Sequence, residues 1–284
     1  MSSIARRLGS SCARPPTSGP TRSTPCQRSP PATARASSYD RLGDGPPVVL
    51  VSGGSVDRTA NAGLAAELAG RGVTAYNYDR RGRGPSGDTP PYAIDREIED
   101  IAAVIEVAGG RAHLYGSSSG AALAMRAAAA GLPVAKLAMW EPPYSVHGRP
   151  DLPDDTASVY RELVSAGRRG DAAEYFMAKV VGMPPEFVAG ARQQPWWPQQ
   201  EALAHTLAYD AEIMGDYTIP AELARSVPVP TLVVIGGASF GFFEETADAL
   251  VELIPDARRS TLEGQEHNVD PAALAPALAE FFKA

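Results

Sequence analysis

The segment His113–Ala124 restricts the fold more than any other, because a short apolar run, a sharp turn and a helical pattern follow one another there. The turn, Gly116–Gly120, reads Gly-Ser-Ser-Ser-Gly, and only Ser118 has a glycine both two residues before and two residues after it. Glycine suits these positions because the chain must fold back without side-chain bulk. The pattern is typical of a nucleophile elbow, in which a serine hydroxyl is exposed on a strained strand-to-helix turn. It predicts that Ser119 begins the helix, with its N–H facing a space where the helix dipole favours negative charge.

Charge is unevenly distributed along the 284 residues. The net charge is −7, but residues 1–39 contain six arginines and no acid, so removing those six positive charges leaves −13 on the remainder. An acidic body disfavours nucleic acids and anionic membranes as partners. No apolar run approaches the roughly 18 residues of a membrane-spanning helix. Both cysteines, Cys12 and Cys26, lie in the basic segment, which fits a reducing compartment, and we expect a cytoplasmic protein.

Residues 1–39 differ in composition from everything that follows. They are rich in Arg, Ser, Pro and Thr and show no hydrophobic periodicity, which predicts a disordered basic leader before a folded domain at 40–284. Such a composition is compatible with an organelle transit peptide, although the prolines oppose an amphipathic helix. A flexible tail and a mis-assigned start are the interpretations we prefer. A secretory signal is disfavoured because an apolar central region is lacking.

Strand-like and helical patterns alternate strictly through the first part of the folded domain. Buried strands are expected at 48–51, 73–78, 112–115 and 134–140, with helices near 64–70, 94–107 and 119–130. This order predicts a parallel sheet covered by helices. Catalytic groups in such sheets lie beyond the carboxyl ends of the strands.

Residues from about 144 to 226 interrupt the alternation with helical patterns alone. The alternation then resumes with a strand at 231–235, a helix at 244–254, a strand at 258–262 and a helix at 271–282. The interrupting segment is therefore predicted to be a helical cap over the strand ends.

Four motifs resemble those of the α/β-hydrolase family in order and spacing. The strand and turn Val48–Gly54 resembles the family's oxyanion loop, and Asp79–Ser86 resembles its Asp-x-Arg-Gly-x-Gly-x-Ser turn. Gly116–Gly120 resembles the elbow, and Gly264–His267 the histidine loop before the last helix. The resemblance covers nearly all of 43–284. It implies an α/β-hydrolase fold, with a mostly parallel central sheet flanked by helices and an inserted helical cap.

Two places depart from the family pattern. Ser52 stands in the oxyanion loop where a histidine is common. Residues 24–39 occupy the place of the family's N-terminal β-hairpin without strand patterning, so no strands are expected there.

The resemblance implies a nucleophile and a base. Ser118 takes the place of the nucleophile, which needs a base within hydrogen-bond reach at neutral pH. Among the four histidines, His267 takes the place of that base, on a loop that can face the strand ends. His113 is expected in the core, and His147 and His205 in the cap.

The acid is less clearly indicated. The family commonly places it after the strand at 231–235, but Gly236–Phe240 contains no carboxylate. Glu244 and Glu245 come later, where acidic residues simply suit the start of a helix. A variant of the family places the acid after the preceding strand, and Glu141 stands there. We prefer Glu141 as the residue that orients His267.

The remaining expectations concern the oxyanion and bound groups. The N–H groups of Ser119 and of Gly54, with Ser55 as second choice, are expected to form the oxyanion hole. No cofactor or metal ion is expected, because metal-ligand spacing, a phosphate-binding loop and a dinucleotide fingerprint are lacking.

These residues predict a serine hydrolase that cleaves a small ester, lactone or thioester through an acyl-enzyme on Ser118. The expected partner is a small-molecule ester-type substrate, and the sequence indicates neither its identity nor the oligomeric state. A serine at the elbow disfavours the dehalogenases and epoxide hydrolases, which use a carboxylate. The alternatives are a cofactor-free haloperoxidase-like or acyl-transfer enzyme on the same triad, and a non-catalytic ligand-binding homologue.

Overall fold

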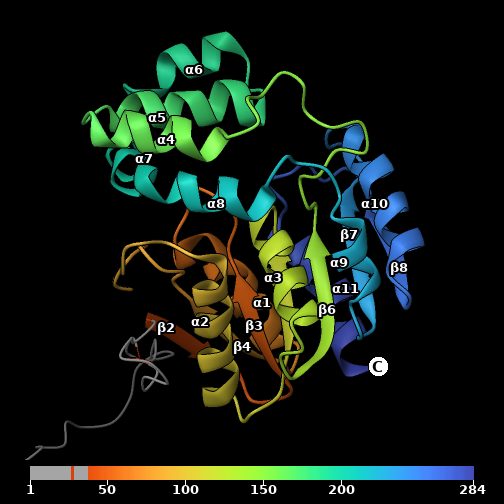
Figure 1. Ribbon diagram of the computed structural model, residues 1–284. Helices are drawn as coiled ribbons and strands as arrows, with labels where there is room; N and C mark the ends of the chain where they lie inside the picture. Colours follow the sequence, from red (N-terminus) through yellow and green to blue (C-terminus); the bar gives the residue numbers. More distant parts are fainter. Residues whose placement is uncertain (1–26, 29–37) are drawn as a thin grey trace, which may run out of the picture.

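A twisted sheet of eight strands forms the centre of the computed structural model, which describes residues 27–28 and 38–284 (Figure 1). The strand order is β1-β2-β4-β3-β5-β6-β7-β8, and β3 to β8 run parallel. The strands span Gln27–Arg28 (β1), Ser38–Leu42 (β2), Pro47–Val51 (β3), Thr74–Tyr78 (β4), Ala112–Ser117 (β5), Val134–Trp140 (β6), Thr231–Gly236 (β7) and Ala257–Leu262 (β8). The predicted mostly parallel sheet is confirmed.

The expectation that residues 24–39 contain no strands is wrong. β2 begins at Ser38 and pairs antiparallel with β4, and β1 pairs antiparallel with β2. Ser38 and Tyr39 are buried, and Ser38 N donates to Ser86 Oγ at 2.9 Å. The hydrogen bonds of this strand come from a partner almost 40 residues away, so its own sequence need not alternate. β2 starts two residues before the predicted boundary at residue 40, and the rest of the predicted leader, Gln27–Arg28 apart, lies outside the described residues.

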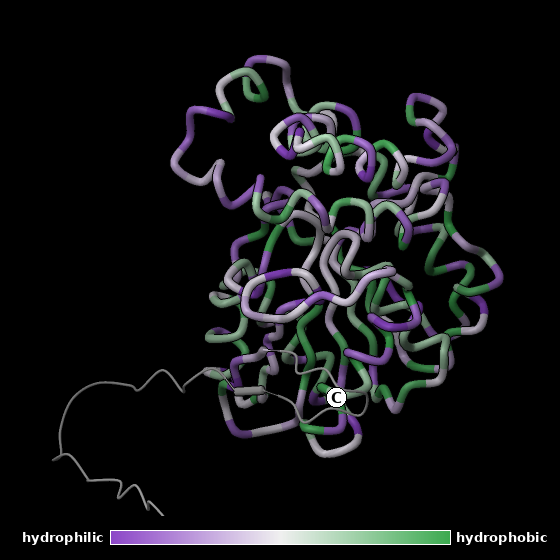
Figure 2. The backbone as a smooth tube through the Cα atoms, turned by 60° about the vertical axis from the view of Figure 1, so that its left-hand side comes forward, coloured by the Kyte–Doolittle hydropathy of each residue, from purple (hydrophilic) through white to green (hydrophobic). Residues whose placement is uncertain are grey.

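Helices cover both faces of the sheet because side chains on each strand alternate between two cores. Val48 and Leu50 face a cluster that includes α1 (Ala62–Gly70) and α11 (Pro271–Lys283). Val49 and Val51 face a second cluster, built with α2 (Ile94–Val107), α3 (Ser119–Ala129) and α10 (Phe242–Leu253). Figure 2 shows the most hydrophobic backbone segments running through the interior of this layered body.

The segment between β6 and β7 is helical, and its first helices lie over the carboxyl ends of the strands (Figure 1). It contains α4 (Thr156–Ser165), α5 (Arg169–Tyr175), a π-helical turn (Phe176–Val181), α6 (Pro185–Ala191), α7 (Trp197–Leu203), a 3-10 turn (Ala204–Thr206), α8 (Leu207–Met214) and α9 (Ala221–Arg225). α8 lies between the outer cap helices and the sheet. No helix in the described ranges is long and apolar enough to cross a membrane.

His113 on β5 should make the protein less stable at mildly acidic pH. Its side chain is 8% exposed, its ring stacks on Phe282 at 4.8 Å, and burial lowers its pKa to about 4. The unfolded chain, with an imidazole pKa near 6.5, therefore binds more protons between pH 6.5 and 4. The free energy of unfolding should fall as pH falls through that window, by up to about 3 kcal/mol.

Thermal unfolding measured from pH 7 to pH 4 tests this expectation. His113→Phe should flatten the fall in Tm. His147→Gln is the matched control, because that side chain is 83% exposed, and it should keep the wild-type slope. Equal slopes for wild type and His113→Phe would contradict the assignment.

Candidate active site

Ser118 occupies a sharp turn between β5 and α3, with φ +53° and ψ −129°. Few L-residues adopt this backbone conformation, and such strain is concentrated at functional sites. The turn is held by hydrogen bonds from Ser118 N to Trp140 O and from Ala121 N to Ser118 O, both 2.8 Å. A β-carbon on Gly116 would lie 2.6 Å from the Cα of Ala121, and one on Gly120 would lie 2.5 Å from Ser52 O. Both glycines are therefore required by close approach of the backbone.

Glu141 and His267 are in direct contact. His267 Nδ1 lies 2.6 Å from Glu141 Oε2, and the Glu141 side chain is fully buried. Glu141 follows β6 at φ +43°, a second strained position beside the elbow. The ring of His267 stacks on Phe243 at 5.2 Å, and Trp140 Nε1 donates to His267 O at 3.0 Å. The carboxylate, the aromatic ring and the backbone bond together fix the orientation of the imidazole.

The segment after β7, which lacks a carboxylate, donates hydrogen bonds to Glu141 instead. Gly236 N donates to Oε1 at 2.8 Å, and Ser239 Oγ donates to Oε2 at 3.0 Å. Glu244 and Glu245 instead make ion pairs on the protein surface, Glu244 with Arg259 and Glu245 with His147. The geometry thus places a buried carboxylate against His267 at the end of β6.

Two cavities meet at Ser118 and His267. The cap cavity, about 70 Å³, extends under the cap and is lined mainly by apolar and aromatic side chains, including Tyr160, Leu207, Met214, Tyr217, Phe240 and Phe242. The loop cavity, about 280 Å³, extends towards α1 and the loop after His267, and its lining includes Val56, Asn61, Leu64, Trp140, Met183 and Val269. Gly54, Ser118, Phe176, Val181 and His267 line both. Two separate spaces therefore adjoin Ser118 and His267.

The two candidate oxyanion donors border the cap cavity beside Ser118. Ser119 is the first residue of α3, and the first N–H groups of a helix have no partner within it. Gly54 lies in the turn after β3. The residue before it, Gly53, is so close to the elbow that a β-carbon there would lie 3.1 Å from Ser118 Cβ. Ser55, the second choice, directs its hydroxyl to Gln200 of the cap.

The comparisons with known proteins agree with this geometry. The sequence profile described as the alpha/beta hydrolase family matches residues 48–277. The chain belongs to that family. A crystal structure of an alpha/beta hydrolase from Sphaerobacter thermophilus is 52% identical, with a TM-score of 0.84 over 90% of this chain and all of that one.

Other proteins that resemble this hydrolase are named enzymes. An esterase from Thermogutta terrifontis shares the fold, with a TM-score of 0.70 at 23% identity over 92% of this chain and 98% of the other. N-formylmaleamate deformylase of Pseudomonas putida is 37% identical over 142 residues, which is 48% of this chain. The match spans about half the length of that curated relative, 53%.

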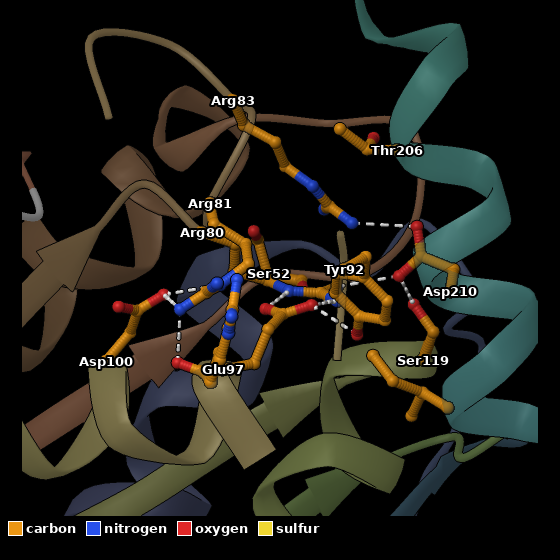
Figure 3. A network of polar contacts seen from close by, with 12 residues as sticks. Ser52, Arg80, Arg81, Arg83, Tyr92, Glu97, Asp100, Ser119, Thr206 and Asp210 are labelled. Atoms are coloured by element: carbon orange, nitrogen blue, oxygen red, sulfur yellow. Dashed lines mark hydrogen bonds and ion pairs between the residues drawn. The ribbon is translucent and has the colours of Figure 1, made fainter. Parts of the chain in front are cut away.

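A buried ion network joins the elbow of the hydrolase to its cap (Figure 3). Asp210 on α8 accepts from Arg80 and from Arg83, each at 2.7 Å, and its Oδ1 also accepts from Ser119 Oγ at 2.8 Å. Arg80 makes a second, bidentate pair with Glu97 at 2.8 and 2.9 Å. Burial alone would raise the pKa of Asp210, but Arg83 and Arg80 outweigh it and hold that pKa below its usual value.

The same two arginines hold the loop that contains Gly54. Arg80 donates to Ser52 O at 3.2 Å, and Arg83 donates to Gly53 O and, at 3.1 Å, to Val56 O. The network therefore fixes both candidate oxyanion donors relative to each other and to α8.

Sequence reasoning missed Asp210 entirely. The available signal was an acid within a short, mainly apolar helix, in which most of the neighbouring residues are buried as Asp210 is. Within residues 27–28 and 38–284, no three His, Cys, Asp or Glu side chains are arranged to hold a metal ion.

Proposed function

We propose that this hydrolase cleaves a small ester, lactone or thioester through an acyl-enzyme on Ser118. The observation that carries the proposal is the 2.6 Å contact between His267 and the buried Glu141, beside cavities that His267 and Ser118 both line. A serine on a strained turn, a histidine and an orienting carboxylate are the three groups that nucleophilic acyl transfer requires.

In this mechanism Ser118 Oγ attacks the carbonyl carbon while His267 takes the hydroxyl proton through Nε2. Glu141 holds Nδ1, which keeps Nε2 free to accept and stabilises the imidazolium. The N–H groups of Gly54 and Ser119 bind the oxyanion of the tetrahedral intermediate. The bond to the leaving group then breaks as His267 returns the proton to it. Water, deprotonated by His267, attacks the acyl-enzyme and releases the acid and Ser118.

The size of the cap cavity supports a small acyl group. A single water needs about 10–15 Å³ of cavity volume, so a cavity of about 70 Å³ has room for a small acyl group.

A formyl amide is the second candidate substrate class. The relative from Pseudomonas putida is named for deformylation of N-formylmaleamate, and formyl is the smallest acyl group that the cap cavity can take. The same residues would attack the formyl carbon, with the amine as leaving group.

A fluorophosphonate probe and a short-chain chromogenic ester, p-nitrophenyl acetate, test the proposal. Wild type should be labelled at one site and should turn the ester over, and Ser118→Ala should do neither. An N-formyl amide assayed beside the ester distinguishes the two substrate classes. A wild type that is neither labelled nor active would overturn the enzymatic proposal and favour a ligand-binding homologue.

We propose a small-molecule substrate and a cytoplasmic location. The net charge of −7 disfavours nucleic acid as a partner. No cysteine occurs after residue 26, which suits a reducing compartment.

A further inference from the structure

The peptide unit that contains the candidate oxyanion donor, Gly54 N–H, is held from the body of the protein. Arg83 donates to Gly53 O and, at 3.1 Å, to Val56 O. Gly53 O and Gly54 N–H belong to one trans peptide unit, so the two groups point in opposite directions. The carbonyl side of this unit faces Arg83, and the N–H side faces away from it. Gly54 itself lines both cavities together with Ser118.

Ser55, the next residue, has a strained backbone. Its φ of +57° is in the left-handed region, where the β-carbon of an L-residue lies too close to the backbone. Gly54 offers no resistance to a change there, because glycine adopts positive and negative φ about equally well. Without contacts that hold Ser55, this residue would relax to a negative φ and the peptide between Gly54 and Ser55 would turn with it.

The side chain that holds Ser55 comes from the cap. Gln200 on α7 accepts a hydrogen bond from Ser55 Oγ through its Oε1, and its Nε2 donates to Ser55 O at 3.3 Å. One amide group thus binds both the hydroxyl and the carbonyl of a single residue, and that residue is buried. Ser55 and Gln200 are 145 residues apart in the chain, so the contact forms only when α7 lies on the loop after β3.

The preceding residue of α7 contacts the same loop farther from the candidate donor. Gln199 Nε2 donates to Asp57 Oδ2 at 3.0 Å, in an exposed contact. The carboxylate of Asp57 also caps the 3-10 turn Arg58–Asn61. Both glutamines therefore join the cap to the body, but only Gln200 acts on the residue directly after Gly54.

We propose that Gln200 is a positioning residue of the oxyanion hole, which holds Ser55 in its left-handed conformation and thereby keeps Gly54 N–H directed at the oxyanion. Gln200 lines neither cavity, so it acts through Ser55 rather than on the substrate. The inference rests on the proposed function, because it takes Ser118 as the nucleophile and Gly54 as an oxyanion donor. It adds that the hole is complete only while α7 of the cap lies on the loop.

The two neighbouring glutamines give a matched pair of variants. Gln200→Met removes the amide and keeps the length of the side chain, and Gln199→Met makes the same change one residue earlier. For p-nitrophenyl acetate, Gln200→Met should lower kcat about tenfold and change KM by less than about twofold, a part of the roughly 100- to 1000-fold loss that deletion of an oxyanion donor causes. Acylation and deacylation both form a tetrahedral oxyanion, so both rates fall together and KM hardly changes.

Gln199→Met should keep the wild-type kcat and KM, because its contact lies away from Gly54. Equal losses of kcat in the two variants, or a rise in KM at constant kcat in Gln200→Met, would show that Gln200 only fastens the cap. Either result would overturn the proposal.

A trifluoromethyl ketone, 1,1,1-trifluorobutan-2-one, reports on the oxyanion hole without turnover. Ser118 Oγ adds to the carbonyl carbon, the hydroxyl proton passes to His267, and the carbonyl oxygen becomes an oxyanion. The Ki should rise about tenfold in Gln200→Met, in proportion to the fall in kcat/KM, and stay unchanged in Gln199→Met. An unchanged Ki beside a lowered kcat would place the effect of Gln200 outside the oxyanion hole.

Ser55→Gly tests whether Gln200 acts through Ser55. A glycine at this position has no hydroxyl for Gln200 to bind and adopts a positive φ without strain. Adding Gln200→Met to Ser55→Gly should therefore lower kcat by less than about twofold, compared with about tenfold in the wild-type background. A full tenfold loss in both backgrounds would contradict the proposed route.

Failure of this inference is distinguishable from failure of the proposed function. If wild type is labelled by the fluorophosphonate and turns over the ester, and Gln200→Met keeps the wild-type kcat and Ki, only the role of Gln200 fails. If wild type is neither labelled nor active, the assignment of the nucleophile fails, and both proposals fail with it. Circular dichroism and Tm should show that every variant is folded at the temperature of the assay.

Discussion

Glu141→Gln should lower kcat for a short-chain ester by about four orders of magnitude, the loss known when the orienting acid of a serine triad becomes an amide. Glu141 Oε2 lies 2.6 Å from His267 Nδ1 and also accepts a hydrogen bond from Ser239 Oγ. The other oxygen of Glu141, Oε1, accepts a hydrogen bond from Gly236 N. A glutamine turned with its oxygen towards Gly236 N, the donor to Oε1, presents its NH₂ to Nδ1 and to the Ser239 hydroxyl at the position of Oε2. The imidazole would then carry its proton on Nε2, where it cannot accept the proton of Ser118. Steady-state kinetics with active-site titration measures the loss.

The matched controls are the two acids that follow β7 in the chain. Glu244 and Glu245 have side chains that are 65% and 58% exposed, and each pairs with a surface residue. Glu244→Gln and Glu245→Gln should keep wild-type kcat. If Glu141→Gln were active and a variant at either control position were inactive, the acid that orients His267 would have to be assigned to α10 instead. Circular dichroism and Tm should show that all three variants remain folded.

Much of the fold could be predicted because its strands are local apolar runs. The runs at 48–51, 137–140 and 231–235 are buried on both faces, so the apolar residues of each run predict the strand without reference to its partners in the sheet. β2 could not be predicted in this way, because Ser38–Leu42 is held by pairing with β4 rather than by its own apolar residues. The formation of β2, a strand of both polar and apolar residues at the start of the folded domain, therefore depends on tertiary contacts.

The candidate site likewise contains residues that local sequence predicts and residues that only tertiary contacts bring together. Glu141 could be selected from its place after β6, and the structure adds why the chain after β7 has no acid: that segment provides hydrogen-bond donors to Glu141. Asp210 lies 130 residues from Arg80 and 91 from Ser119 in sequence. No local pattern connects these three side chains, since they meet only when the cap folds over the elbow.

Asp210→Ala should lower the free energy of unfolding by about 3–5 kcal/mol, because it leaves two buried arginines with one buried acid. Arg80, Arg83, Glu97 and Asp210 together carry no net charge, and all four are buried. Urea unfolding measures the loss. Glu212→Gln is the matched control: it removes an acid from the same helix, but one that pairs with a half-exposed Arg161, and it should cost under about 1 kcal/mol.

The double variant Arg83→Met/Asp210→Leu distinguishes charge balance from positioning. It leaves Arg80 paired with Glu97 alone, so the buried charges are balanced again and the free energy of unfolding should return most of the way to wild type. It still lacks the bonds from Arg83 to Gly53 O and Val56 O and the bond from Ser119 Oγ to Asp210. Its kcat should therefore stay about tenfold or more below wild type, since one oxyanion donor is worth at least that much. A double variant that recovers both stability and kcat would show that the network balances charge without setting the oxyanion hole.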